Sequence, residues 1–137
     1  DSRQSRGLGD VYKRQCYDLR FPLWSKNKYK NNEFNYDILI YVANWPAVRS
    51  NAWKSLLKAR AIENMSYVVG VNRIGQDANE IKYNGNSRVY DFKGERMDDF
   101  MENMPRVQIN NLDKNELDSF RNKFPVLKDA DDFNLLI

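Results

Sequence analysis

Cys16 is the one cysteine of this 137-residue chain and the residue whose type could support covalent chemistry. A thiolate is a strong nucleophile, and a thiol at a helix start has a lowered pKa because the N-terminal amides favour the anion. Cys16 precedes a predicted helix in which Pro22 suits the first turn. A lone cysteine is, however, more often a small buried hydrophobic residue. The residue types alone leave both interpretations open.

The chain contains no histidine, so it cannot by itself form a Ser-His-Asp triad, a Cys-His dyad or an HExxH zinc site. The single cysteine likewise excludes an internal disulfide and a multi-cysteine zinc site. A nucleophilic Cys16 would therefore take its general base from a carboxylate, an amine or a group outside this sequence.

Further candidate residues follow the apolar run Asp37–Ala43, which has the length and continuity of a strand buried on both faces. Asn44 and Trp45 come directly after this run, and Arg49 lies in the loop that follows. Loops at strand ends often contact ligands, and a planar guanidinium suits a carboxylate. Arg49 could equally be a solvated loop charge, and Trp45 a core aromatic. The candidate substrate-binding residues are therefore Asn44, Trp45 and Arg49.

The elements that would position these residues follow one another as strand, helix and strand. The strand at 37–43 is followed by a helix at about 51–64, with Ser50 as its N-cap, and by a second buried strand at 67–71. This order favours a parallel crossover unit and hence an α/β fold. The second half predicts a polar loop at 74–86, a hairpin at 87–101, a strand at 105–110 and an amphipathic helix at 114–124.

The first fifteen residues differ in character from the rest of the chain. They carry four basic and two acidic residues and show no sustained hydrophobic period, which indicates a tail or linker rather than a packed element. The stretch SRGLGDVYKRQ also resembles a translated library-adapter string. We expect residues 1–15 to be a non-native tail and residues 16–137 to form one incomplete domain.

Composition and charge exclude several classes of protein. With 42% hydrophobic and 13% aromatic residues, the chain has the composition of a globular protein. Its 22 basic and 19 acidic residues leave a net charge of +3, which is too small and too mixed to indicate a nucleic-acid partner. No apolar run approaches the roughly 20 residues of a membrane span, and no secretory signal is present. We expect no membrane partner and a cytoplasmic location.

The segment Cys16–Pro22, with the sequence CYDLRFP, resembles the nucleophile segment of the carbon-nitrogen hydrolase (nitrilase) superfamily. Further similar blocks follow in order, namely Tyr36–Pro46, Arg49, Trp53, Lys58–Asn64, Tyr67–Arg73, Gly85–Arg88 and Phe124–Asp131. The combination of Asn-Trp-Pro at 44–46 with Arg-Ala-Ile-Glu-Asn at 60–64 is most similar to the bacterial omega-amidase branch. Members of that branch hydrolyse 2-oxoglutaramate and 2-oxosuccinamate.

The resemblance implies an α-β-β-α sandwich of the nitrilase type and amide hydrolysis without a metal or organic cofactor. Cys16 would attack the side-chain amide carbonyl, ammonia would leave, and water would hydrolyse the thioester. The backbone N–H of Tyr17 would supply one oxyanion donor. The resemblance also implies a small-molecule amide substrate and a homodimer of the intact parent.

The family's general base, a Glu, and its Lys lie well upstream of the cysteine, in a half that this chain lacks. Glu33, Glu63 and Lys13 do not match those positions. We therefore expect the chain to be the C-terminal half of an enzyme and to be inactive alone. Arg20 is either an ion-pair partner near the cysteine or a ligand of the substrate carboxylate, and we expect the structural role. Structural roles are also expected for Arg60 and Glu63, which would pair on one helix.

Two alternatives stay open. The substrate could be another small amide, such as deaminated glutathione or an N-carbamoyl compound. The chain could also be a non-catalytic fragment or interaction module that keeps the C-terminal half of the fold.

Overall fold

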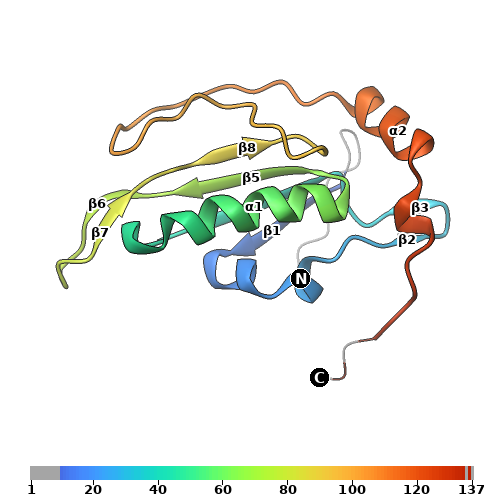
Figure 1. Ribbon diagram of the computed structural model, residues 1–137, viewed down its shortest axis with the longest axis horizontal. Coiled ribbons are helices and arrows are strands. Elements are labelled where there is room, and N and C mark those ends of the chain that lie inside the picture. The colour runs from blue at the N-terminus through green and yellow to red at the C-terminus, as the bar shows by residue number, and fades with distance from the viewer. Residues whose placement is uncertain (1–9, 135, 137) are drawn as a thin grey trace.

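A four-stranded mixed sheet forms the centre of the structure, a computed structural model that describes residues 10–134 and 136 (Figure 1). The strands stand in the order β1-β4-β5-β8. They are β1 Val11–Gln15, β4 Ile38–Ala43, β5 Tyr67–Asn72 and β8 Arg88–Tyr90. The first three are parallel, and β8 is antiparallel to β5. The α/β class expected from the sequence is confirmed.

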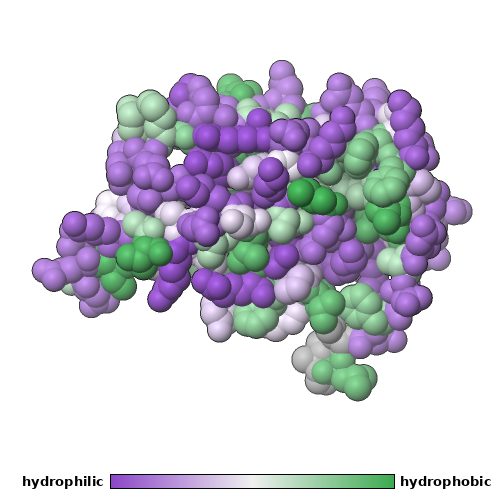
Figure 2. Space-filling view, viewed as in Figure 1, coloured by the Kyte–Doolittle hydropathy of each residue, from purple (hydrophilic) through white to green (hydrophobic). Residues whose placement is uncertain are grey.

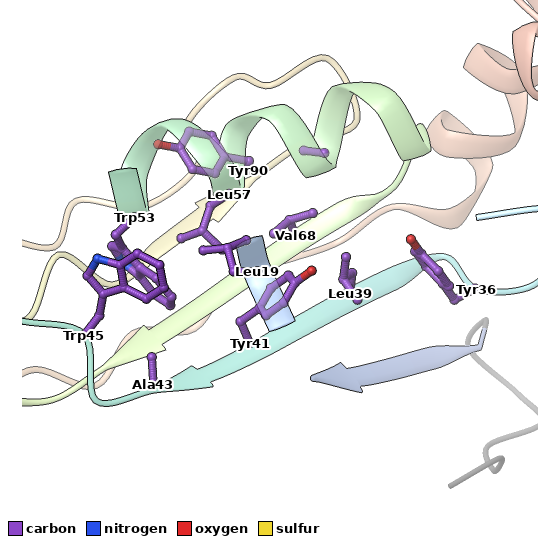
Figure 3. Packing of buried hydrophobic residues seen from close by; sticks show 11 residues of the cluster. Leu19, Tyr36, Leu39, Tyr41, Ala43, Trp45, Trp53, Leu57, Val68 and Tyr90 are labelled. Atoms are coloured by element: carbon purple, nitrogen blue, oxygen red, sulfur yellow. The ribbon is translucent and has the colours of Figure 1, made fainter. Parts of the chain in front are cut away.

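Helix α1, Ser50–Asn64, connects β4 to the parallel strand β5 and packs on one face of the sheet. Trp53 and Leu57 of α1 belong to one fully buried cluster with Leu39 of β4 (Figure 3). A Cβ atom at Gly70 of β5 would approach Leu57 Cδ1 to 2.4 Å. The missing side chain thus lets α1 pack close to the sheet. The predicted crossover unit is confirmed.

Ser50 does not cap α1, contrary to the prediction. The N-cap is Arg49, because the 3-10 helix Ala47–Arg49 leads directly into α1. The hydroxyl of Ser50 lies 2.8 Å from Asn84 Oδ1 and 3.3 Å from Asn86 Nδ2, with a hydrogen bond to each. Contacts with two residues far along the chain therefore occupy the group that would have capped the helix.

The two faces of the sheet differ in how well they are covered. On the face under α1, Leu39 and Tyr41 are fully buried, and the surface on this side is mostly hydrophilic (Figure 2). On the opposite face, 61% of Val42 and 48% of Val71 are exposed. The strand at 37–43 is therefore not buried on both faces as expected. An α-β-β-α sandwich would place its second sheet over this opposite face.

Strand β1 contradicts the expectation that residues 1–15 form no packed element, as far as Val11–Gln15 are concerned. These residues pair in parallel with β4 at the edge of the sheet. Tyr12 stacks on Tyr36 with ring centroids 5.4 Å apart, whereas Lys13 and Gln15 are exposed. An edge strand with charged residues carries little hydrophobic periodicity, so the pattern did not indicate it. Residues 1–9 lie outside the described residues.

Three other segments differ from the secondary structure predicted for them. The segment expected as a polar loop contains an antiparallel hairpin of β6 Ile74–Gln76 and β7 Lys82–Asn84. The helix predicted at Pro22 is limited to a single 3-10 turn, Pro22–Ser25. The predicted hairpin at 87–101 forms only β8 and one bridge from Tyr90 to Arg96.

The strand predicted at 105–110 is absent, since no described strand pairs with it. Helix α2, Lys114–Lys123, confirms the last predicted element. Asp113 caps it by accepting hydrogen bonds from the backbone N–H groups of Asn115 and Glu116. A small hairpin of β2 Tyr29–Lys30 and β3 Glu33–Phe34 and a 3-10 helix, Val126–Lys128, complete the fold. Within the described ranges, no helix is long and apolar enough to cross a membrane.

Candidate active site

Three residues with reactive or polar side chains lie at one edge of the sheet. Because β1, β4 and β5 are parallel, their carboxyl ends lie at the same edge, and the next residues along the chain are Cys16, Asn44 and Arg73. Neighbouring strands are about 4.8 Å apart, so the edge brings these positions together. Ligands of α/β proteins commonly bind outside the carboxyl ends of the strands.

Cys16 begins a five-residue 3-10 helix, Cys16–Arg20, which we call the cysteine turn. Its side chain is half-buried and packs against the main hydrophobic cluster. Asp18 accepts a hydrogen bond from the backbone N–H of Gln15 over 3.3 Å, which closes the start of the turn. The following residue, Tyr17, is 66% exposed. The element after the cysteine is thus a short turn rather than the α-helix expected.

Helix α1 anchors the backbone of the cysteine turn through the side chain of Arg60. Leu19 is fully buried in the core, and its carbonyl oxygen accepts a hydrogen bond from Arg60 Nη2 over 2.6 Å. Arg60 Nη1 pairs with Glu63 Oε1 at 2.9 Å, which confirms the predicted ion pair. Arg60 is only 4% exposed. The guanidinium therefore links the helix directly to the backbone of the turn.

A buried polar cluster anchors the chain just after the turn. Asn27 accepts Tyr36 N–H through Oδ1 and donates from Nδ2 to the Tyr36 carbonyl over 2.9 Å. Its own N–H donates to Asn64 Oδ1 over 2.9 Å. The hydroxyl of Tyr41 bonds Ser25 Oγ over 3.0 Å, and burial raises the pKa of Tyr41. Burial also raises the pKa of Tyr36, so both phenols stay neutral.

The loop after β4, residues 44–49, is held by Trp45. This residue is buried, and its Nε1 donates to the carbonyl oxygen of Arg49 over 2.8 Å. The guanidinium carbon of Arg20 lies 4.9 Å from the centroid of the Trp45 ring. The structure therefore brings Arg20 of the cysteine turn onto the 44–49 loop. Within residues 10–134 and 136, Arg20 forms this stack and not the ion pair expected.

Asn44 and Arg49 are both exposed. The side chain of Arg49 forms no ion pair within the described part of the chain. A guanidinium in that state is available for an anionic ligand. The geometry thus keeps Arg49 as a candidate contact for a substrate carboxylate.

Sequence reasoning missed the β6–β7 hairpin beside this edge. The hydroxyl of Tyr83 donates to Asp77 Oδ2 over 2.8 Å, and the guanidinium carbon of Arg73 lies 4.7 Å from the Tyr83 ring centroid. The backbone N–H of Ile81, and next the Tyr83 hydroxyl, lower the pKa of Asp77. In the sequence, Arg73 follows a buried strand, as Asn44 does. This position could have marked Arg73 as a candidate site residue.

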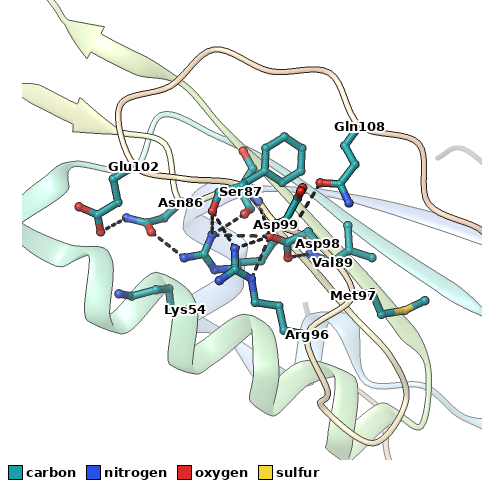
Figure 4. A network of polar contacts seen from close by, with 12 residues as sticks. Lys54, Asn86, Ser87, Val89, Arg96, Met97, Asp98, Asp99, Glu102 and Gln108 are labelled. Atoms are coloured by element: carbon teal, nitrogen blue, oxygen red, sulfur yellow. Dashed lines mark hydrogen bonds and ion pairs between the residues drawn. The ribbon is translucent and has the colours of Figure 1, made fainter.

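A second polar network fixes the segment after this hairpin (Figure 4). The carboxylate of Asp98 is completely buried and lies 2.7 Å from Arg96 Nη2 and 3.8 Å from Arg88 Nη1. Arg88 Nη2 donates to Asn86 Oδ1 over 2.8 Å, and Asn86 Nδ2 donates to Glu102 over 2.9 Å. Burial lowers the pKa of Arg88. These contacts stabilise the backbone of residues 86–102.

A cleft of about 510 Å³ opens on the less covered face of the sheet. Its lining includes Asn72 and Arg73 at the end of β5, together with Val71, Met104 and Arg106. Cys16 does not line this cleft, so the cleft borders the candidate site without containing the thiol. No cluster of three or more His, Cys, Asp or Glu side chains that could hold a metal ion occurs in the described part of the chain.

The comparisons with known proteins agree with this geometry. The carbon-nitrogen hydrolase family matches residues 14–122. The chain is 47% identical to the omega-amidase YafV of Escherichia coli (strain K12) over 120 residues, which are 88% of this chain and 45% of that protein. It is 38% identical to the 2-oxoglutaramate amidase of Paenarthrobacter nicotinovorans, over 83% of this chain and 37% of that protein.

The fold agrees with a solved structure as well. XC1258 of Xanthomonas campestris, a CN-hydrolase superfamily protein, superposes with a TM-score of 0.89 at 38% sequence identity. The superposition covers 93% of this chain and 49% of XC1258. The chain thus spans less than half the length of these three proteins. The matched residues and the α/β fold show that the chain belongs to the carbon-nitrogen hydrolase family.

Proposed function

We propose that the full-length protein carrying this chain hydrolyses the side-chain amide of a 2-oxo-dicarboxylate monoamide, such as 2-oxoglutaramate or 2-oxosuccinamate. The observation that carries the proposal is the place of Cys16, at the carboxyl edge of the parallel strands beside Asn44. The similarity to an omega-amidase and a 2-oxoglutaramate amidase supports this substrate class.

Cys16 would act as the nucleophile. Its sulfur attacks the amide carbon, the carbon–nitrogen bond breaks as nitrogen takes up a proton, and ammonia leaves. Water then attacks the thioester carbon, which releases the carboxylic acid and restores the thiol. The Tyr17 backbone N–H would donate to the oxyanion. Arg49, with Asn44, would hold the end of the substrate that carries the carboxylate, and the buried Trp45 would fix the loop that carries both.

The general base and the lysine of this reaction would come from outside this chain. Glu63 is engaged by Arg60, and Lys13 is an exposed residue of the edge strand β1. Neither position matches the upstream Glu and Lys that the resemblance implies. The 137-residue chain is therefore proposed to be inactive alone, and a homodimer of the full-length protein stays a prediction.

The test is ammonia release from 2-oxoglutaramate by the full-length protein and by its Cys16→Ala variant. A methyl group cannot form the thioester, so we expect the variant to lose activity completely. Mass spectrometry of the rapidly quenched wild type should show an acyl adduct on the peptide that contains Cys16. Activity of Cys16→Ala within severalfold of the wild type would overturn the assignment of the nucleophile.

A second candidate substrate is deaminated glutathione. The chain is 30% identical over 112 residues to the deaminated glutathione amidase of Dictyostelium discoideum. Hydrolysis of deaminated glutathione at a higher kcat/KM than 2-oxoglutaramate would favour this candidate. A full-length protein that releases ammonia from neither compound would favour the non-catalytic alternative.

A further inference from the structure

We propose that Asn72 is a positioning residue, which holds the 44–49 loop in place for the substrate. The inference rests on the proposed function, because it takes Asn44 and Arg49 of this loop as substrate contacts. Asn72 is the last residue of β5 and is only 9% exposed. It is paired in register with Ala43, the last residue of β4. Its side chain therefore lies at the point where β4 ends and the 44–49 loop begins.

The side-chain amide of Asn72 binds Trp45 as a neighbouring peptide group would. Asn72 Oδ1 accepts a hydrogen bond from the backbone N–H of Trp45 over 2.7 Å. Asn72 Nδ2 donates to the carbonyl oxygen of Trp45 over 3.0 Å and to that of Gly85 over 2.7 Å. The amide thus extends the β4–β5 pairing beyond the strand ends and ties two loops to β5.

This set of contacts requires an amide at position 72. An acceptor must face the Trp45 N–H while two N–H donors face two carbonyl oxygens, and only Asn and Gln combine an acceptor with two donors. Gln is longer by one methylene and would displace the loop. An Asp would turn a second oxygen toward the two carbonyl oxygens, and a Leu would leave all three buried backbone groups unpaired.

Trp45 transmits the position of Asn72 to the rest of the candidate site. Its Nε1 donates to the carbonyl oxygen of Arg49, and its ring lies under the guanidinium of Arg20. The ring centroid is also 5.5 Å from that of Trp53 in the core. Asn72 touches no reacting atom, so its effect on the reaction passes through Trp45.

The test uses the full-length protein with the variants Asn72→Asp and Asn72→Leu, which both preserve the approximate size of the side chain. The control is Ser87→Ala, because Ser87 Oγ bonds the backbone N–H of Asn72 over 3.1 Å and not its side chain. The first measurement is amide hydrogen exchange. We expect faster exchange at residues 44–49 in both Asn72 variants, with the exchange of β1 and α1 unchanged, and no change at 44–49 in Ser87→Ala.

The second measurement separates positioning from general stability. Loss of the loop geometry should lower kcat/KM for 2-oxoglutaramate by about tenfold to hundredfold, mainly through a higher KM. The rate at which iodoacetamide alkylates Cys16 should stay within about twofold of the wild type, because the cysteine turn is anchored separately by Arg60. Ser87→Ala should keep kcat/KM within about threefold.

The possible results separate this inference from the proposed function. Unchanged exchange at residues 44–49 in both Asn72 variants would overturn it, whatever the activity. Faster exchange with unchanged kcat/KM would also overturn it, because Asn72 would then stabilise the loop without serving the reaction. If the wild type did not hydrolyse 2-oxoglutaramate, the proposed function would fail, and kcat/KM for the amide that it does hydrolyse would decide the inference. A wild type that hydrolyses no amide would overturn both.

Discussion

Arg60 Nη2 donates a hydrogen bond to the carbonyl oxygen of Leu19 over 2.6 Å. This contact joins helix α1 to the turn that carries Cys16. Leu19 itself is completely buried, so water has little access to its carbonyl oxygen. The position of Cys16 thus depends on a charged side chain 44 positions further along the chain.

Arg60→Met should therefore destabilise the protein and slow its reaction. The loss of a charged donor to a buried carbonyl should lower the free energy of unfolding by about 1–3 kcal/mol. A displaced turn should lower kcat and leave KM for the substrate nearly unchanged. Urea unfolding and steady-state kinetics of the full-length protein measure both.

Glu63→Gln is the matched control for Arg60→Met. It removes the charge at the other end of the ion pair and keeps the bond to Leu19. The carboxylate is 36% exposed, so the change in the free energy of unfolding should stay below about 1 kcal/mol. A similar loss of kcat in both variants would show that the ion pair, and not the bond to Leu19, sets the position of the turn.

Much of the sheet and both α-helices could be predicted from the sequence. The strands near 37–43 and 67–71 are continuous apolar runs, and α2 lies within the amphipathic stretch predicted to be a helix at 114–124. Strand β1 could not be predicted, because the charged residues of an edge strand hide its period. The segment 105–110 has the alternation of a strand but no described partner, and sequence patterns do not reveal a missing partner.

The candidate site was predictable only in part. The resemblance to a family singled out Cys16 and the 44–49 loop, and the structure brings Arg20 onto Trp45 of that loop. Asn72 was missed because its role depends on hydrogen bonds to backbone groups of distant residues. A buried asparagine at the end of a strand has no sequence signal that separates it from a turn residue.

Asp132 should make stability depend on acid pH. Hydrogen bonds from Lys30 and then Lys28 lower the pKa of its carboxyl group from 3.8 to about 2. A carboxyl group with a lowered folded-state pKa stabilises the fold above its unfolded pKa and loses this effect as pH falls. The free energy of unfolding of the wild type should therefore fall toward that of Asp132→Asn between about pH 4 and pH 2.

Asp131→Asn is the control for this titration, because Asp131 is exposed and its carboxylate forms no ion pair with the described residues. Its stability should follow that of the wild type over the whole range. The difference between wild type and Asp132→Asn should also shrink in high salt, since exposed ion pairs are screened. A difference that is constant from pH 5 to pH 2 would contradict the assignment.

The poorly covered face of the sheet should bind a hydrophobic dye when the 137-residue chain is alone. Val42 and Val71 expose 61% and 48% of their surface on this face. Exposed apolar patches and unpaired strand edges promote dye binding and aggregation. The fluorescence of an anilinonaphthalene sulfonate dye should rise with the chain and fall in the double variant Val42→Thr, Val71→Thr.

Val48→Thr is the control for the dye experiment, because Val48 is 89% exposed but lies in the 44–49 loop rather than on this face. It should leave the dye signal unchanged. A chain that is monomeric, unfolds cooperatively and binds no dye would contradict the expectation that this face packs against a second layer.

Arg49→Lys should reveal whether Arg49 binds the carboxylate of the substrate. Lysine keeps the charge but not the two-pronged geometry of the guanidinium. The loss of a charged hydrogen bond should amount to about 1.5–3 kcal/mol, which is about a tenfold to hundredfold fall in kcat/KM for 2-oxoglutaramate. A neutral amide without that carboxylate should lose much less, because nothing in it uses the guanidinium. Steady-state kinetics of the full-length protein with both amides measures the difference, and an equal loss on the two would exclude Arg49 from the binding site.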